Sequence, residues 1–313
     1  MENCIVLNTF DRILKVFGIN QASYTSKPPP TNVPAEKNGM IFLGLTVHLT
    51  PVILFVLTVS LLNFSLGAII ISFLITSMYS LLIIRLAEKK CPIVQLKQLT
   101  KSDIYYGLSL IFITAVIFGS TFLIFSNYIL SSIFPLKWQS CNWSSVILAL
   151  FLTDFAYYWI HRTLNHSKNS STIIKWYRKI HAKHHAVEAL DFYRGNISTF
   201  FDTAVTGFQI PLIIISTFLG MNLETIVTTY CLVLLLQSTH HANFTFNIGP
   251  LRYLFVDNHA HKLHHCPRGY DVNFGAIFSV WDLFFRTYYE EWSLSASYLA
   301  KNKIALPLRR VIV

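Results

Sequence analysis

The sequence predicts an all-α integral membrane protein with about four to six membrane helices, one pair of them a short hairpin, and a helical cap on the cytosolic side. Three observations lead to this prediction. The chain of 313 residues is 53% hydrophobic and 13% charged, whereas soluble domains carry about 25% charged residues. Apolar runs of bilayer length recur along the chain, and the basic residues are concentrated in alternate connecting segments.

The apolar runs define the expected membrane helices, because about 20 apolar helical residues span the hydrocarbon core. Four of these runs occupy residues 41–62, 64–84, 104–130 and 143–160. A further run, residues 203–239, is too long for one crossing and contains Gly220-Met221-Asn222 in its middle. It is expected to form a hairpin of two short helices that either crosses the bilayer or dips into it.

The basic residues indicate the orientation of these helices. With six crossings, 24 of the 25 Lys and Arg residues fall on one side, in residues 1–40, 85–103, 161–202 and 240–313. Only Lys137 falls on the other side. Because Lys and Arg favour cytoplasmic loops, that side is expected to be the cytosol. This segregation accounts for the net charge of +10 without a nucleic-acid partner.

Histidines cluster on the same side. The words "HRTLNH", "HAKHH" and "HKLHH" begin at His161, His181 and His261, and "HHANF" begins at His240. Residues i, i+3 and i+4 share one face of a helix, so each HxxHH triplet presents its imidazoles along one stripe. Neutral imidazoles bind transition metals. By contrast the five cysteines contain no CxxC pair, which argues against a disulfide framework or a cysteine zinc site.

The three motifs HRTLNH, HAKHH and HKLHH supply eight imidazoles. One ion needs fewer, so this number suits two metals. His161 and His166 are five residues apart and do not share a helical face well. The helix is therefore expected to end or bend near Asn165 and so turn His166 back. His48 lies inside an apolar run and is expected to be a helix-packing or cavity residue, away from the cytosolic face and its histidine boxes.

The sequence also resembles the fatty acid hydroxylase/sterol desaturase superfamily of membrane di-iron enzymes. The three histidine words match the three boxes of that family, and "DFAYYWIHR", "HANF" before "GPLRYLF", and "VNFGAIFSVWDLFFRTYY" resemble the flanking segments. The resemblance covers residues 143–290, approximately. It implies that the box histidines are catalytic through the metals they hold, and that His241 is a further ligand. The implied ligands are His161, His166, His181, His184, His185, His241, His261, His264 and His265.

Two departures from the family pattern stand out. Many members keep a histidine in an "RxHP" word after the second box, but this chain has no histidine between His185 and His240. The cluster could lack one ligand, or Asn196, His240 or His259 could fill that place, so His240 and His259 are candidate further ligands. The closing "FGT" of the family reads "FRT" here, with Arg286 in the place of glycine.

Carboxylates near the boxes are expected to accept the second ring N–H of a ligand and fix its tautomer. Asp154 is the best candidate, because it is an acid inside an apolar helix and lies seven residues before His161. A hydrogen bond between packed helices is the alternative role for Asp154.

The function implied is that of a non-haem di-iron oxygenase that hydroxylates or desaturates a lipid, such as a sterol or a fatty acyl chain, with dioxygen. The expected cofactors are two Fe, with Zn possible after exchange. The chain has no flavin or nicotinamide motif, so electrons would come from a b-type cytochrome or a reductase. One alternative is a pterin-dependent ether-lipid monooxygenase, or a lipid aldehyde-processing enzyme, of the same fold. Another, from a different class, is a histidine-rich metal transporter, which should carry its ligands at mid-bilayer depth.

The sequence predicts four segments along the chain. Residues 1–40 form a cytosolic N-terminal segment and linker, 41–142 membrane helices, 143–290 the catalytic domain, and 291–313 a basic C-terminal tail. The expected location is the endoplasmic reticulum membrane in a eukaryote, or the cytoplasmic membrane in a bacterium, with the histidine boxes cytosolic.

Overall fold

The computed structural model of the chain describes residues 38–90, 141–167, 171–185, 207–242, 246, 248–265 and 272–289. This described part is helical, and its one β-type contact is an isolated bridge between Phe255 and Phe278. The expected all-α architecture is confirmed. Three helical segments within these ranges are long and apolar enough to cross a membrane, namely Gly44–Leu61, Leu66–Ala87 and Trp143–Asn165. The predicted run at 104–130 lies outside the described residues.

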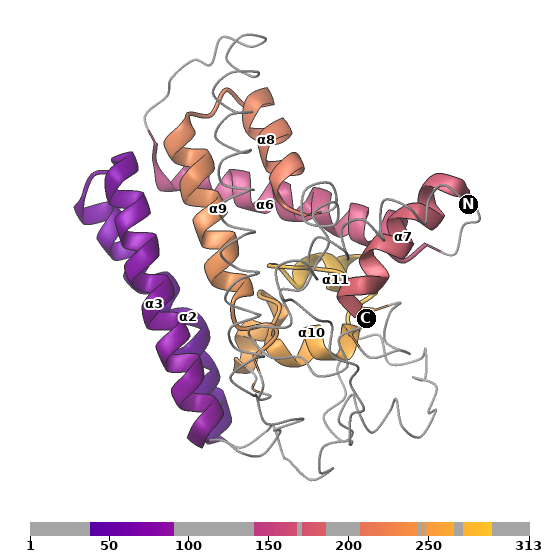
Figure 1. Ribbon diagram of the computed structural model, residues 1–313, viewed down its shortest axis with the longest axis horizontal. Helices are drawn as coiled ribbons and strands as arrows, with labels where there is room; N and C mark the ends of the chain where they lie inside the picture. The colour runs from indigo at the N-terminus through magenta and orange to yellow at the C-terminus, as the bar shows by residue number, and fades with distance from the viewer. Residues whose placement is uncertain are drawn as a thin grey trace, which may run out of the picture.

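The first two membrane helices, α2 (Asn38–Leu61) and α3 (Leu66–Lys90), lie side by side on one flank of the molecule (Figure 1). The turn that joins them places Asn63 and Phe64 in the left-handed region. Both helices also contact α9 (Leu223–Gln237), and Figure 1 shows α9 next to them. Many of their large apolar side chains are exposed, as expected of helices whose outer faces meet lipid.

The third long helix, α6 (Trp143–Ile160), begins with a side-chain cap. Asn142 accepts a hydrogen bond from the backbone N–H of Ser145 at 2.9 Å, which satisfies one of the free donors of the first turn. The helix packs against both α8 and α9 and continues into a π-helical turn, η3 (His161–Asn165). The helix therefore ends at Asn165, as the spacing of His161 and His166 predicts.

The predicted hairpin is present as α8 (Gln209–Phe218) and α9, with a turn at Gly220, whose φ is +63°. Asn222 caps α9 by accepting from the N–H of Thr225 at 2.9 Å. The 10 residues of α8 rise by about 15 Å, half of a hydrocarbon core, so α8 alone is too short to cross it.

Short elements complete the described structure around the ends of α6 and α9. They are α7 (Thr172–His185), η5 (Gly249–Tyr253), α10 (Asn258–His264) and α11 (Val280–Phe284). Residues 272–289, which include α11, are called the closing segment below. Asp154 of α6 anchors this segment by accepting the backbone N–H groups of Ile277 and Phe278 at 3.0 and 2.9 Å. The histidines of η3, α7 and α10 lie near this segment and gather at one place.

Candidate metal centre

The π-turn η3 sets the first box. The N–H of His166 bonds to the carbonyl of His161 at 3.2 Å, a spacing of five residues instead of four. This wider turn brings the two rings to the same side of the chain, with centroids 4.8 Å apart. A regular α-helix would place residues five apart on different faces. The π-turn is therefore the local feature that lets both imidazoles of "HRTLNH" face one point.

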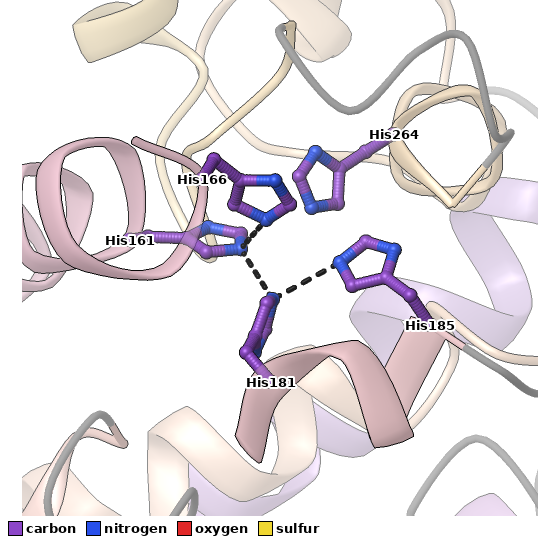
Figure 2. A group of neighbouring side chains, drawn as sticks. All are labelled: His161, His166, His181, His185 and His264. Atoms are coloured by element: carbon purple, nitrogen blue, oxygen red, sulfur yellow. Dashed lines mark hydrogen bonds between the residues drawn. The ribbon is translucent and has the colours of Figure 1, made fainter. Parts of the chain in front are cut away.

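Five histidines form a first group, in which one ligand atom of each lies within 4.8 Å of those of the others: His161, His166, His181, His185 and His264. Figure 2 shows their rings converging from three segments of chain. The Nε2 atom of His161 is 3.1 Å from that of His166 and 3.0 Å from that of His181. The Nε2 atoms of His181 and His185 are also 3.0 Å apart.

Four histidines form a second group with the same 4.8 Å limit: His184, His241, His261 and His265. The Nε2 atom of His261 lies 2.9 Å from that of His241 and 3.0 Å from that of His265. His241 enters the group from the turn that follows α9, in the word "HANF". The structure thus brings together the nine histidines that the sequence proposes as ligands, in two sets.

Each HxxHH triplet is divided between the two groups. On α7, His181 and His185 face the first group and His184 faces the second. On α10 the division is reversed, since His264 faces the first group while His261 and His265 face the second. The groups adjoin one another, because the rings of His185 and His265 stack with centroids 4.4 Å apart. Helices α7 and α10 therefore bridge both groups.

Backbone carbonyls fix two of the ring tautomers. His161 donates from Nδ1 to the carbonyl of Phe274 at 2.7 Å, and His264 donates from Nδ1 to that of Val272 at 2.8 Å. A carbonyl only accepts, so each Nδ1 carries the proton and each Nε2 carries a lone pair. The Nε2 atom of His264 is buried and has no hydrogen-bond partner in the described part of the chain. Buried lone pairs that converge in this way fit a cation at their centre.

Burial favours the neutral ligand form of these rings. It lowers the pKa of His264 to about 3, although the hydrogen bond to Val272 opposes the shift. Burial, followed by the neighbouring histidines, also places the pKa values of His185, His241 and His265 well below 6.5. At neutral pH these rings are uncharged, which is the state that binds a metal.

The closing segment holds the carbonyls that orient the rings. Asp282 accepts the N–H groups of Phe274 and Gly275 at 2.8 and 2.7 Å, and the hydroxyl of Thr287 at 2.7 Å. A Cβ on Gly275 would lie 2.6 Å from the carbonyl oxygen of Phe278, so this position needs glycine. Asn273 adopts a φ of +54°, which asparagine tolerates better than most residues. Asp282 is thus a site-building residue that the histidine pattern does not predict, although the word "WDLFFRT" contains it.

The structure corrects the role proposed for Asp154. Its oxygens bond to the backbone of the closing segment and to the Nε1–H of Trp281 at 3.1 Å, and none of its hydrogen bonds within the described residues goes to a histidine. The buried N–H groups of residues 277 and 278 lie opposite its carboxylate, so both oxygens are already used. Asp154 therefore has the alternative role, a hydrogen-bonded link between packed elements. Carbonyl groups, rather than a carboxylate, orient His161 and His264.

The two candidate further ligands lie outside both groups. His240 donates from Nε2 to the carbonyl of Val256 at 3.1 Å, and its ring lies against that of His261 with centroids 5.0 Å apart. His259 is buried on α10 but is a member of neither group. The described geometry therefore gives these two candidates no place in either group, and their role as ligands stays a prediction. Asn196, the third candidate for the missing "RxHP" position, lies outside the described residues.

Comparison with known families gives one match. Residues 146–287 match the family model described as "Fatty acid hydroxylase". No curated protein and no solved structure matches the chain. All nine histidines of the two groups fall within the matched residues. The match confirms the resemblance to the fatty acid hydroxylase/sterol desaturase superfamily and implies an oxidoreductase of the lipid hydroxylase or desaturase type.

Proposed function

We propose that this chain, whose residues 146–287 match the fatty acid hydroxylase family model, is a membrane-bound non-haem di-iron oxygenase. It would hydroxylate or desaturate a lipid with dioxygen. The observation that carries the proposal is the pair of adjoining histidine groups, with five and four converging ring nitrogens. Each group has enough donors to hold one metal ion.

The donor set fits iron, or zinc acquired by exchange. Imidazole nitrogen is a common ligand of both metals, whereas oxygen donors would favour magnesium or calcium. Two irons bound here would supply electrons and the site of dioxygen activation for oxidising an unactivated C–H bond. All nine proposed ligands are neutral, so they leave the charge of the metals uncancelled. The protein holds the donor atoms in place through the closing segment and keeps them buried.

An aromatic path connects the membrane hairpin with the first group. The ring of Tyr157 stacks on that of Phe208, at the start of α8, with centroids 4.7 Å apart. The same tyrosine ring lies 5.2 Å from that of His161. These contacts place apolar rings between the membrane hairpin and the first group, which supports an apolar substrate. The proposed substrate is therefore a lipid taken from the bilayer, such as a sterol or a fatty acyl chain.

The proposed partners follow from the reaction. Dioxygen is the oxidant, and a b-type cytochrome or a reductase supplies electrons at the cytosolic face. Three helices of membrane-spanning length support an integral membrane location. The endoplasmic reticulum, or the cytoplasmic membrane of a bacterium, is the proposed compartment, with the histidine groups on the cytosolic side.

Metal analysis tests the proposal most directly. Protein purified from iron-supplied cells should contain close to two Fe per chain, or two Zn after exchange. A His181→Ala variant, matched in expression, should contain less. A stoichiometry of one that does not respond to iron supply would exclude the two-metal centre.

Isotope labelling tests the chemistry. Lipids from cells that express the wild type under ¹⁸O₂ should contain a product that is missing with His181→Ala. A label in that product indicates hydroxylation, whereas an unlabelled new double bond indicates desaturation. Product formation that depends on a reduced pterin, rather than a cytochrome, would favour the ether-lipid alternative. Metal uptake with no lipid product would favour the transporter.

A further inference from the structure

His48 lies on α2, outside the residues that match the family, and its apolar run predicts a position away from the site. His48 is a packed residue, as expected, but the structure places it only two ring contacts from the second histidine group. The His48 side chain is 1% exposed, and a hydrogen bond of 2.6 Å joins its Nδ1 atom to the hydroxyl of Thr239. Thr239 lies in the turn that follows α9. Two residues later in that turn is His241, a member of the second histidine group.

A series of imidazole ring contacts, one stacked and one tilted, continues from His48 to the same group. The rings of His48 and His240 are nearly parallel, with centroids 6.0 Å apart and an interplanar angle of 19°. The ring of His240 lies 5.0 Å from that of His261, which is in the second group. The hydrogen bond from His240 to Val256 fixes the rotation of the middle ring. His48 therefore reaches the group both through the turn and through the ring contacts.

The turn after α9 is held from two directions. From α10, the amide Nδ2 of Asn258 donates to the carbonyls of Thr239 and His240, each at 2.9 Å. From α2, His48 contacts the side chains of the same two residues. Asn258 belongs to the matched family region, whereas His48 belongs to the membrane helix pair beside it. Helix α2 thus contributes a side-chain contact to the turn that carries His241.

A packing residue would not need to be histidine. The Nε2 atom of His48 is buried and has no hydrogen-bond partner among the described residues. A polar atom buried in this way costs free energy that a leucine or phenylalanine at the same place would avoid. The polar contact with Thr239 and the ring contact with His240 need an imidazole. Thr239 lies two residues before His241, and the ring of His240 contacts that of His261, so both contacts join His48 to neighbours of the second group.

We infer that His48 is a positioning residue that holds His241 and His261 in the second histidine group, acting through Thr239 and His240. The inference rests on the proposed metal centre. It makes the membrane helix pair part of the support for one metal and not for the other. Losing the contact should therefore weaken one metal site selectively, as replacing the supports of metal ligands does elsewhere.

The test uses full-length protein in detergent, loaded with Fe(II) or with Co(II) as a spectroscopic probe. His48→Phe keeps a ring but removes the hydrogen bond, and Thr239→Val removes it from the other side. His48→Asn restores a short polar group near the position of Nδ1. Thr229→Val is the matched control, because the Thr229 hydroxyl is buried on α9 but donates within its own helix, to the Thr225 carbonyl at 2.7 Å. Metal per chain, release to a chelator and the Co(II) absorption bands are the readouts.

His48→Phe and Thr239→Val should release one of the two metals about 10–100-fold faster than the wild type and leave the other unchanged. The Co(II) bands of that one site should shift. His48→Asn should recover part of the slow release, and Thr229→Val should behave as the wild type. If His48→Phe does not fold, Thr239→Val and His48→Asn still decide the matter. The inference is overturned if these variants keep both metals with wild-type release, or if both metals are released equally faster. A wild type with one metal would instead overturn the proposed function.

Discussion

The two histidine groups are made of the same side chain but are supported differently. The first group has five members, and the carbonyls of Phe274 and Val272 hold two of its rings, His161 and His264. The second has four members, and the Nδ1 atoms of His261 and His265 are buried with no hydrogen-bond partner in the described ranges. Its support comes from the turn after α9 and from α2. Ligand rings that donate to an acceptor hold a metal more firmly, so the two sites should not be equivalent.

The difference also concerns how many coordination positions remain. Five protein donors nearly complete an octahedral ion, whereas four leave more room for an external ligand. We therefore expect the first metal to be retained longer and the second to exchange sooner. The second site is also the one whose support includes residues outside the family match.

Replacement of one ligand in each group should have the largest effect. His161→Ala and His261→Ala each remove one proposed metal ligand, so the proposed lipid turnover should fall by more than about 100-fold, beyond the loss that supporting residues cause. The metal contents should differ, since each variant loses the metal of its own group first. Metal analysis beside product formation, at matched expression, measures both effects. Wild-type turnover in either variant would show that the group concerned is not a metal site.

Loss of the carboxylate that holds the closing segment should act on the first group alone. In Asp282→Asn the amide cannot accept from both Phe274 and Gly275 as the carboxylate does, so the Phe274 carbonyl should lose its fixed position against His161. We expect a loss of about 10–100-fold in metal affinity or turnover, with the second metal unchanged. The measurement is metal release to a chelator.

Asp154→Asn provides the matched control for this variant. It also removes a buried carboxylate that accepts two backbone N–H groups of the closing segment, but its partners are Ile277 and Phe278, away from the oriented carbonyls. It should lower stability by about 1.5–3 kcal/mol, as expected for hydrogen bonds to a charged group, without a selective effect on the first metal. If both variants release the first metal at the same rate, Asp282 has no special role.

The sequence predicts the ligands better than it predicts their support. The i, i+3, i+4 spacing and the family words identify the nine histidines that converge, and the apolar runs identify the long helices. The division of each triplet between two groups depends on how α7 and α10 face one another, which is a tertiary relation. A pattern along one helix does not contain it.

The roles of Asp154 and His48 were hard to predict for the same reason, since they depend on tertiary contacts. Asp154 stands out in an apolar helix, but its partners lie more than 120 residues later in the chain. The contact of His48 with Thr239 spans 191 residues. Carbonyl groups that orient His161 and His264 have no sequence signature at all. Among these supporting residues, only Asp282 could be identified from the sequence, because it lies in the "WDLFFRT" motif, which resembles the closing motif of the family.

Acid should destabilise the metal-free protein through both groups alike. Burial lowers the pKa of His264 to about 3, so as pH falls below 6.5 the unfolded chain takes up a proton that the folded chain does not. Stability should therefore decrease as pH falls from about 6.5 towards 3, by up to about 1.4 kcal/mol per pH unit for this group. The pKa of His265 in the second group shifts in the same direction. The measurement is the thermal midpoint of chelator-treated protein between pH 8 and pH 5.

A His264→Gln variant is the control for the acid effect, and its midpoint should fall less steeply with pH. A midpoint that does not change between pH 7 and pH 5 would contradict the prediction. Since both groups titrate in the same direction, acid should not discriminate between them. A chelator at neutral pH should discriminate, because it tests the support of each ion rather than the charge of the rings.

The smallest effect concerns Arg286, which stands where the family has glycine. The backbone of Arg286 has a φ of +58°, in the left-handed region, where a Cβ costs about 1–2 kcal/mol. Arg286→Gly removes that strain, and after the extra entropy of glycine in the unfolded chain we expect a gain of about 1 kcal/mol, or roughly 2 °C in the thermal midpoint. Arg286→Ala removes the charge but keeps the Cβ, so it should give no gain.

The next residue, Thr287, donates to Asp282 and contacts the hydroxyl of Tyr158 at 2.9 Å, so the turn belongs to the support of the first group. The gain should therefore slow release of the first metal and leave the second unaffected, and an equal gain in Arg286→Ala would assign the effect to charge instead of backbone strain.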